Sequence, residues 1–147
     1  ESPQHVAGLV INKPTRTKLQ KIFQVKGFKT INISDLVYSG GPVNQGNIIM
    51  MHTNEWKCKN TLPLANGISI TSDPQMLKKM HEQDQPQAWR VFSGLSIWSP
   101  GQLEGEINSK CWMTAIPTPE LSLETPTTQI YEKAIEICSK QIIDKYI

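Results

Sequence analysis

The chain has 147 residues, of which 38% are hydrophobic and 19% charged, with 15 Lys and Arg against 13 Asp and Glu. This size and composition are typical of one globular domain with its own core and exclude a disordered chain. The net charge of +2 and the scattered basic residues argue against nucleic-acid binding, because many phosphate contacts need clustered Lys and Arg. We expect a single domain over residues 1–147.

Metal sites, disulfides and membrane spans have little support in the sequence. Cys58, Cys111 and Cys138 lie far apart and form no C-x-x-C pair, and no two of the three histidines share a metal-ligand spacing. The apolar runs are too short to span a bilayer. We therefore predict a cytoplasmic protein without a metal, a cofactor or a membrane partner.

The first third of the chain predicts a strand, a helix and a hairpin. The apolar run over residues 6–12 indicates a buried strand that ends at Pro14. A short helix follows, with Thr15 or Thr17 as its N-cap, and its inner face is formed by Leu19, Ile22 and Phe23. Residues 36–38 and 47–52 resemble two strands joined through a Gly-Gly-Pro turn, which predicts a β-hairpin with a long loop.

The middle of the chain alternates between strands and helices. Residues 53–67 are polar and predict a loop, and "GISIT" predicts a short strand. In "SDPQMLKKM" a capping residue, Ser72 or Asp73, precedes Pro74, and the apolar face is formed by Met76, Leu77 and Met80. Residues 89–95 predict a further strand.

The last third predicts one more strand and the longest helix. The strand is "CWMTAI", residues 111–116, closed by two prolines. The helix follows "TPTTQIYEK", with an inner face of Ile130, Ala134, Ile137 and Cys138. Strands and helices thus interleave, which predicts one domain of the α/β type.

Two glycine-containing stretches approach known catalytic motifs without completing them. "GPVNQG" has the glycine spacing of a phosphate loop, but Asn47 and Ile48 stand where Lys and Ser or Thr are needed. "GLSIW" lacks the second glycine of a serine-hydrolase elbow, since Trp98 occupies its place, and no histidine follows Ser96. We find no catalytic constellation. His52, at the end of an apolar strand, is expected to be a hydrogen-bonded structural histidine.

The stretch "SIWSPGQLEGEI" permits two interpretations. As a helix start it would use Ser99 as the cap and Pro100 in the first turn. As a binding site it would offer the free backbone N–H groups of Gly101 and Gln102, and the Gln102 amide, to a small anion or a partner. Because every helix start has such unsatisfied donors, we favour the first interpretation.

The order of several segments resembles the bacterial AlgH/YqgE family. These segments are "GLVINKP", "VYSGGPV", "MMHT", "ISITSDP", "IWSPGQLEGEI" and "CWMTAIP", and together they cover nearly the whole chain. Two positions differ from the family pattern, Ile97 and Ser99, where glycine is usual. Family members also usually begin with a further segment that contains a strand of the type "FLIAMP", which this chain is expected to lack.

The resemblance implies a single α/β (α+β) domain with a mixed, bifurcated β-sheet surrounded by helices, in a bacterial cytoplasmic protein. It supplies no catalytic residue, although some members are labelled regulators of transcription. We therefore expect a non-enzymatic binding or regulatory protein. The binding surfaces are expected in two loops on the same side of the sheet, Gly40–Gly41–Pro42 and Trp98–Ser99–Pro100–Gly101–Gln102.

Two alternatives remain open. The first is an enzyme or small-molecule binder that uses an anion site at the helix start over residues 99–102, and the weaker one is a DNA-binding regulator. The partner is expected to be a protein or a small anion, and both a monomer and a homo-oligomer are compatible with the sequence.

Overall fold

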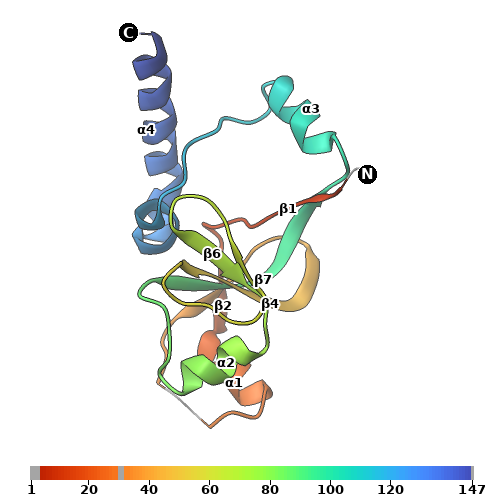
Figure 1. Cartoon of the computed structure of the whole chain (residues 1–147), viewed down its shortest axis with the longest axis vertical. Helices are drawn as coiled ribbons and strands as arrows, with labels where there is room; N and C mark the ends of the chain where they lie inside the picture. Colours follow the sequence, from red (N-terminus) through yellow and green to blue (C-terminus); the bar gives the residue numbers. More distant parts are fainter. Residues whose placement is uncertain (1–3, 30–31, 147) are drawn as a thin grey trace.

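The computed structural model describes residues 4–29 and 32–146. Within them a mixed β-sheet carries helices on both faces (Figure 1). The strands are β1 (Val6–Gly8), β2 (Pro14–Lys18), β3 (Leu36–Ser39), β4 (Val43–Thr53), β5 (Thr61–Pro63), β6 (Ile68–Thr71) and β7 (Trp89–Trp98). The helices are α1 (Leu19–Val25), α2 (Gln75–His81), α3 (Gln102–Asn108), the π-helix η1 (Glu120–Glu124) and α4 (Thr127–Tyr146).

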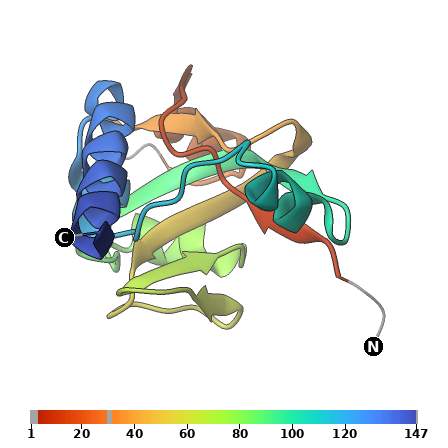
Figure 2. The same ribbon diagram turned by 90° about the horizontal axis from the view of Figure 1, so that it is seen from above.

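The long strand β7 organises the sheet. The strand order is β2-β3-β7-β4-β6-β5, in which β3 runs parallel to β7 and the other pairs are antiparallel. The far end of β7 leaves this arrangement and pairs with β1, with Val6 opposite Trp98 and Gly8 opposite Ser96. Figure 2 shows β1, this end of β7 and α3 projecting from one side of the molecule. The predicted mixed α/β fold is confirmed.

The predicted hairpin between residues 36–38 and 47–52 is wrong. Strands β3 and β4 do not pair, because β7 lies between them and bonds to both. Glycines make this arrangement possible. A Cβ on Gly40 would collide with the backbone oxygen of Gly94, and a Cβ on Gly41 would collide with the backbone of Leu95 and Ser96. The Gly-Gly-Pro segment therefore packs along β7 instead of turning the chain into a hairpin.

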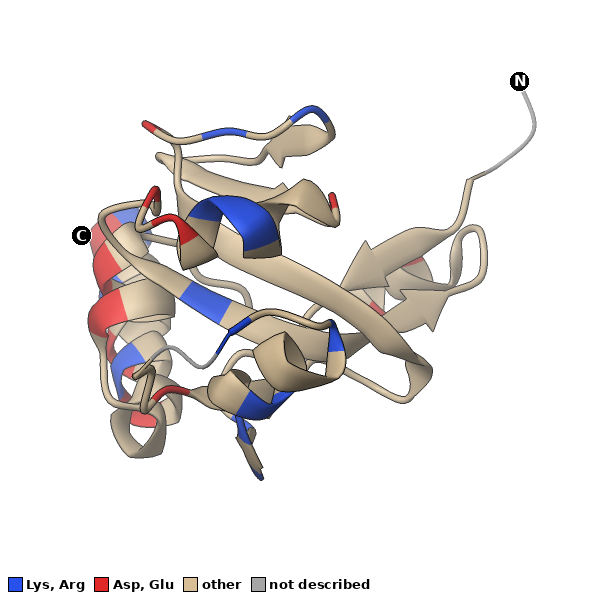
Figure 3. Ribbon diagram, turned by 90° about the horizontal axis from the view of Figure 1, so that it is seen from below, with Lys and Arg blue, Asp and Glu red and all other residues tan. Residues whose placement is uncertain are grey.

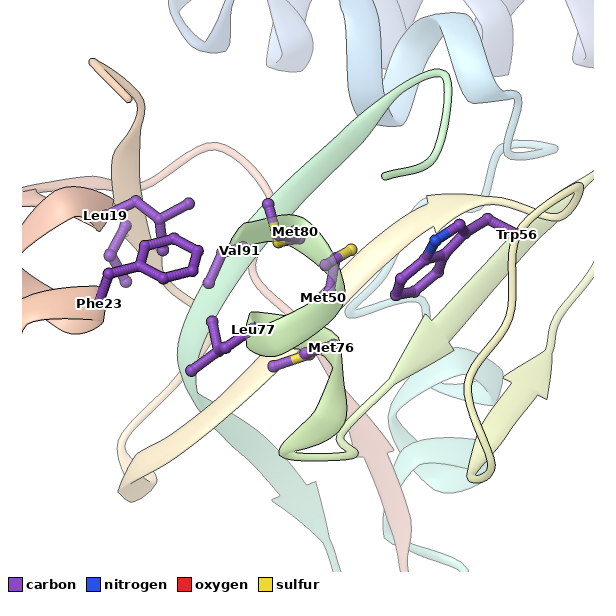
Figure 4. Close-up of a cluster of buried hydrophobic side chains, with 9 residues drawn as sticks. Leu19, Phe23, Met50, Trp56, Met76, Leu77, Met80 and Val91 are labelled. Carbon is purple, nitrogen blue, oxygen red and sulfur yellow. The ribbon is translucent and has the colours of Figure 1, made fainter. Parts of the chain in front are cut away.

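Helices α1 and α2 cover one face of the sheet over a methionine-rich core (Figure 4). Leu19 and Phe23 of α1 are fully buried, as the sequence predicts. Helix α2 contributes the predicted stripe of three side chains, and the sheet contributes Met50 and Val91. This stripe is Met76, Leu77 and Met80. Complete burial of such a side chain stabilises the fold by about 1.5–3 kcal/mol.

The other face of the sheet carries η1 and the beginning of α4. Leu123 of η1 packs on Phe92 of β7 in a second apolar cluster. The buried guanidinium of Arg90 donates from Nη1 to the Ser122 carbonyl at 3.0 Å and from Nη2 to the Thr125 carbonyl. The Arg90 side chain of β7 thus fixes the backbone at the end of η1 to the sheet.

Several predicted boundaries need correction. The strand expected over residues 6–12 ends at Gly8, and Pro14 and Thr15 begin β2 instead of ending a strand. The residue that precedes α1 is Lys18, and no side chain caps this helix; Thr15 instead donates its hydroxyl to the Val37 carbonyl at 2.7 Å. The loop over residues 53–67 contains the short strand β5.

Residues 111–116 do not form the predicted strand. They pair with no strand among the described residues. They belong to the irregular segment that connects α3 to η1 (Figure 1). Their β-like composition therefore leaves apolar side chains exposed, including Trp112, Met113 and Ile116. The long C-terminal helix is confirmed as α4, with Ile130 and Cys138 buried on the predicted inner face.

Candidate functional site

The two loops expected to form a binding surface lie along the same strand. Gly40 donates its N–H to the Ser93 carbonyl at 3.0 Å and accepts a hydrogen bond from the Val10 N–H at 2.9 Å. Gly40 and Gly41 thus lie against residues 94–96 of β7, and Trp98 ends the same strand. The glycines of the first loop serve close backbone packing. Pro42 follows them directly and precedes β4.

Helix α3 begins within "SPGQLEGEI", as predicted, but with different capping residues. The helix starts at Gln102, and Gly101 precedes it with a φ of 78°, which favours glycine. No side chain caps the helix, so Ser99 does not have the capping role expected of it, and Pro100 lies before the first turn. The turn is closed by the N–H of Gln102, which donates to the Ser99 carbonyl at 3.0 Å.

The side chain of Gln102 ties the loop before α3 to the helix. Its Oε1 accepts the Ser99 backbone N–H at 3.0 Å, and its Nε2 donates to Oε1 of Glu106 at 3.0 Å. Two of the donors expected to hold a small anion are thus used within the chain, the Gln102 amide in its bond to Glu106 and the Gln102 backbone N–H in its bond to the Ser99 carbonyl. These bonds also place a carboxylate beside them, which argues against an anion site at residues 99–102.

Glu106 binds two tryptophans through one oxygen. Its Oε2 accepts the indole N–H of Trp112 at 2.7 Å and that of Trp98 at 3.3 Å. The two indole rings meet edge to face, with their centroids 6.1 Å apart and an interplanar angle of 75°. We call Trp98, Gln102, Glu106 and Trp112 the Trp–Glu cluster. It links the end of β7, helix α3 and the following segment.

The hydrogen bonds of the cluster keep Glu106 ionised. The Trp112 indole, then the Gln102 amide and the Trp98 indole, lower the pKa of Glu106 below its ordinary value. Because these partners all donate, they stabilise the carboxylate form. At neutral pH the cluster therefore presents a fixed negative charge between two aromatic rings.

An apolar groove adjoins the cluster, since Trp112 belongs to both. It runs between residues 111–115 and α4 and has a volume of about 370 Å³. The α4 side is formed by residues spaced three and four apart, which share one helical face. These residues are Tyr131, Ala134, Ile135 and Cys138. Trp112 is 49% exposed and Tyr131 67% exposed, so two aromatic side chains of the groove face solvent.

The stretch of chain that contains the groove is acidic although the whole chain is basic. Residues 102–138 contain six glutamates and two lysines, and so a local excess of four negative charges. Figure 3 shows acidic and basic residues alternating along α4, whereas Lys and Arg predominate on the face with α1 and α2. The exposed Trp112 and Tyr131 side chains therefore belong to the more acidic part of the chain.

His52 is a structural residue, as its position on an apolar strand indicated. It is fully buried, and burial lowers the pKa of its imidazole. Nδ1 lies 2.8 Å from the Thr53 carbonyl and must donate to it, so Nε2 accepts from the Thr71 hydroxyl at 2.8 Å. His52 is therefore held neutral and fully hydrogen-bonded, away from any surface.

The described part of the chain holds no cluster of metal ligands and no unpaired buried polar side-chain atom. Over residues 4–29 and 32–146, no group of three or more His, Cys, Asp or Glu side chains could hold a metal ion. In the same ranges no buried side-chain nitrogen or oxygen lacks a hydrogen-bond partner. No helix there is both long and apolar enough to cross a bilayer.

Sequence reasoning missed the two residues that complete the cluster. Glu106 is not among the binding residues expected from the sequence, although its spacing of four from Gln102 places both on one helical face. Trp112 was assigned to a strand, and only the turn after α3, where Cys111 N–H donates to the Glu106 carbonyl at 2.9 Å, returns it to the carboxylate.

Comparison with known proteins identifies the family. A family model described as AlgH-like matches residues 1–142. The chain belongs to the AlgH-like family. The resemblance carried by the "GGPV" and "PGQLE" segments is thereby confirmed.

Relatives of this AlgH-like chain are bacterial proteins without an assigned activity in their names. A UPF0301 protein of Proteus mirabilis is 31% identical over 137 residues, covering 88% of this chain and 73% of its own. A UPF0301 protein of a Polaromonas species is 31% identical over 149 residues, covering 95% and 76%. The chain thus spans about three quarters of the length of these relatives.

Solved structures show the same AlgH-like fold. The solution structure of the AlgH protein from Pseudomonas aeruginosa superposes with a TM-score of 0.77 at 24% identity, over 93% of this chain and 74% of that one. A crystal structure of a protein from Corynebacterium diphtheriae gives a TM-score of 0.61 at 23% identity, over 82% and 64%. At these identities the likeness concerns the fold alone.

Proposed function

We propose that this chain is a non-enzymatic binding protein, and that its binding surface is the Trp–Glu cluster together with the apolar groove beside it. The observation that carries the proposal is the bonding of Glu106. A half-buried carboxylate is fixed by three side-chain donors, and one of these donors, Trp112, also lines an apolar groove. Ordered polar groups beside exposed aromatic rings are typical of recognition surfaces.

The chemistry of this surface favours a basic, amphipathic protein segment as the partner. The groove offers apolar contact area, and residues 102–138, which contain its lining, hold six glutamates and two lysines. A Lys or Arg side chain beside Glu106 would gain the attraction of the carboxylate and of the tryptophan faces. A partner with apolar anchors and flanking positive charges would therefore match both properties.

The Gly40–Gly41–Pro42 loop has a supporting role in this proposal. It packs against residues 94–96 of β7 and so fixes the strand that ends at Trp98. We also infer that the protein acts in the bacterial cytoplasm. This inference is supported by the bacterial relatives and by three cysteines that all remain free thiols.

The proposal can be tested by NMR of the 15N-labelled chain. The probes are a peptide with Leu and Lys at helical spacing and a matched peptide with Glu in place of Lys. We expect the Leu–Lys peptide to shift the indole N–H signals of Trp98 and Trp112, and to leave that of Trp56 unchanged, because Trp56 is buried in the main core. Equal shifts with both peptides, or no shift at the two cluster tryptophans, would refute the proposal.

A further inference from the structure

A second hollow lies on the opposite, basic side of the molecule. It is a cleft of about 600 Å³ between the end of α1, strand β4 and the start of α2. Met76 and Leu77 of α2 line it, and both side chains also belong to the buried core shown in Figure 4. The cleft therefore reaches the apolar interior and is within the size range of small-molecule sites.

An irregularity of β4 forms one wall of the cleft. The register of β4 on β7 shifts between Val43 and Ile48, and Gly46, Asn47 and Ile48 line the cleft at this bulge. A Cβ on Gly46 would meet no atom within 4 Å, so this part of the wall is open. Bulges of this kind are common beside binding sites. The "GPVNQG" stretch thus borders a hollow without having the chemistry of a phosphate loop.

The lining of the cleft is mostly apolar and includes one positively charged side chain. Apolar side chains predominate, the polar ones include Asn47 and Ser72, and Lys26 is the one charged residue of the lining. No carboxylate lines the cleft. The nearest acid along the chain, Asp73, is buried and accepts hydrogen bonds from the backbone N–H groups of Gln75 and Lys59.

The charge of Lys26 is not neutralised within the described residues. The one ion pair found there joins Lys79 to Asp84, with 3.9 Å between Nζ and Oδ2. Residues 4–29 contain six Lys or Arg and no Asp or Glu, so the stretch of chain that carries Lys26 is positive as well. An anionic group at the rim of the cleft would therefore be attracted, while an apolar group could contact Phe28, Met76 and Leu77.

We propose that this cleft binds a small amphipathic anion, an apolar chain or ring that carries one carboxylate or comparable acidic group. The apolar part lies over Met76 and Leu77, and the acidic group lies at Lys26. This site is separate from the Trp–Glu cluster, so the two proposals stand or fall independently.

Octanoate and octanol are suitable probes, because they share the apolar chain and differ in the charge. In spectra of the 15N-labelled chain, octanoate is expected to shift the amide signals of Asn47, Ser72 and Leu77. Octanol is expected to bind at the same place several-fold more weakly. No octanoate shift at these residues, or equal affinity of the two probes, would overturn the proposal.

Two charge-removing variants make the test specific. Lys26→Gln is expected to weaken octanoate binding at least threefold and to leave octanol binding unchanged. Lys21→Gln is the matched control, because Lys21 lies in α1, which ends directly before Lys26, but is outside the lining of this cleft. It removes the same charge and is expected to have no effect. If both variants weakened octanoate binding equally, general surface charge and not the cleft would be responsible.

Discussion

Gln102 and Glu106, one turn apart on α3, are joined by a hydrogen bond of 3.0 Å between Nε2 and Oε1. Because Gln102 also accepts the Ser99 N–H, this pair connects the loop after β7 to the carboxylate that holds both tryptophans. The relationship predicts that Gln102, and not Ser99, fixes the start of α3.

Gln102→Ala should therefore lower the free energy of unfolding by about 1 kcal/mol, the usual net contribution of a hydrogen bond. Ser99→Ala should be nearly silent, because no side chain caps α3. Urea denaturation of the two variants and the parent measures both values. The opposite order, with Ser99→Ala the more damaging, would show that the serine hydroxyl caps the helix after all.

The Gly-Gly-Pro segment should be sensitive to a single methyl group. A Cβ at position 40 would lie 2.7 Å from Cδ2 of Leu9 and still closer to the Gly94 carbonyl, so Gly40→Ala should cost about 1–3 kcal/mol or more. Gly46→Ala is the matched control, with no atom within 4 Å of the added carbon. Thermal unfolding compares them. Equal melting temperatures would mean that β7 does not approach Gly40 as closely as described.

These glycines also show where sequence reasoning reaches its limit. Helix α2 was predictable because its signals are local: Asp73 accepts the Gln75 N–H at 3.0 Å, Pro74 precedes the first turn, and the methionine stripe gives the buried face. The hairpin prediction failed because the strand that separates β3 from β4 comes from residues 89–98, about fifty residues later. No local pattern contains that information.

The candidate site was predictable in part for the same reason. The Trp98–Gln102 loop and the helix after it follow from local motifs. Residues 111–116 have the composition of a strand, but a strand needs a neighbour, and the described residues offer none. That Trp112 returns to Glu106 depends on the turn after α3, which only the three-dimensional structure shows.

His52 should make stability depend on pH. Burial lowers the pKa of the folded-state imidazole, so the unfolded chain binds the proton more readily. The stability that depends on neutral His52 is fully present above the imidazole pKa of the unfolded chain, about 6.5. It is lost as the pH falls below that value. The melting temperature should fall between pH 7.5 and 5.5, and should fall less in His52→Asn. The same pH dependence in both proteins would contradict this account of His52.

The pKa of Glu106 should lie below that of an ordinary glutamate. The Trp112 indole and the other donors lower the pKa of Glu106 in the folded chain. The cluster is therefore intact above the pKa of a glutamate in the unfolded chain, about 4.3, and loosens as the pH falls further. The indole N–H signal of Trp112, followed from pH 7 to 3, should move with a midpoint below about 4.3. In Glu106→Gln this transition should be absent. A midpoint above the ordinary value would show that the indoles do not hold the carboxylate.

The central claim is that the Trp–Glu cluster recognises a basic segment, and the affinity of a fluorescent Leu–Lys peptide for Glu106→Gln tests it most directly. Because solvent screens an exposed charge pair, this variant should bind more weakly than the parent by up to about fivefold in fluorescence anisotropy. Glu104→Gln removes the same charge from the same helix outside the cluster and should bind as the parent does. Equal weakening by the two variants, or none by Glu106→Gln, would contradict the account.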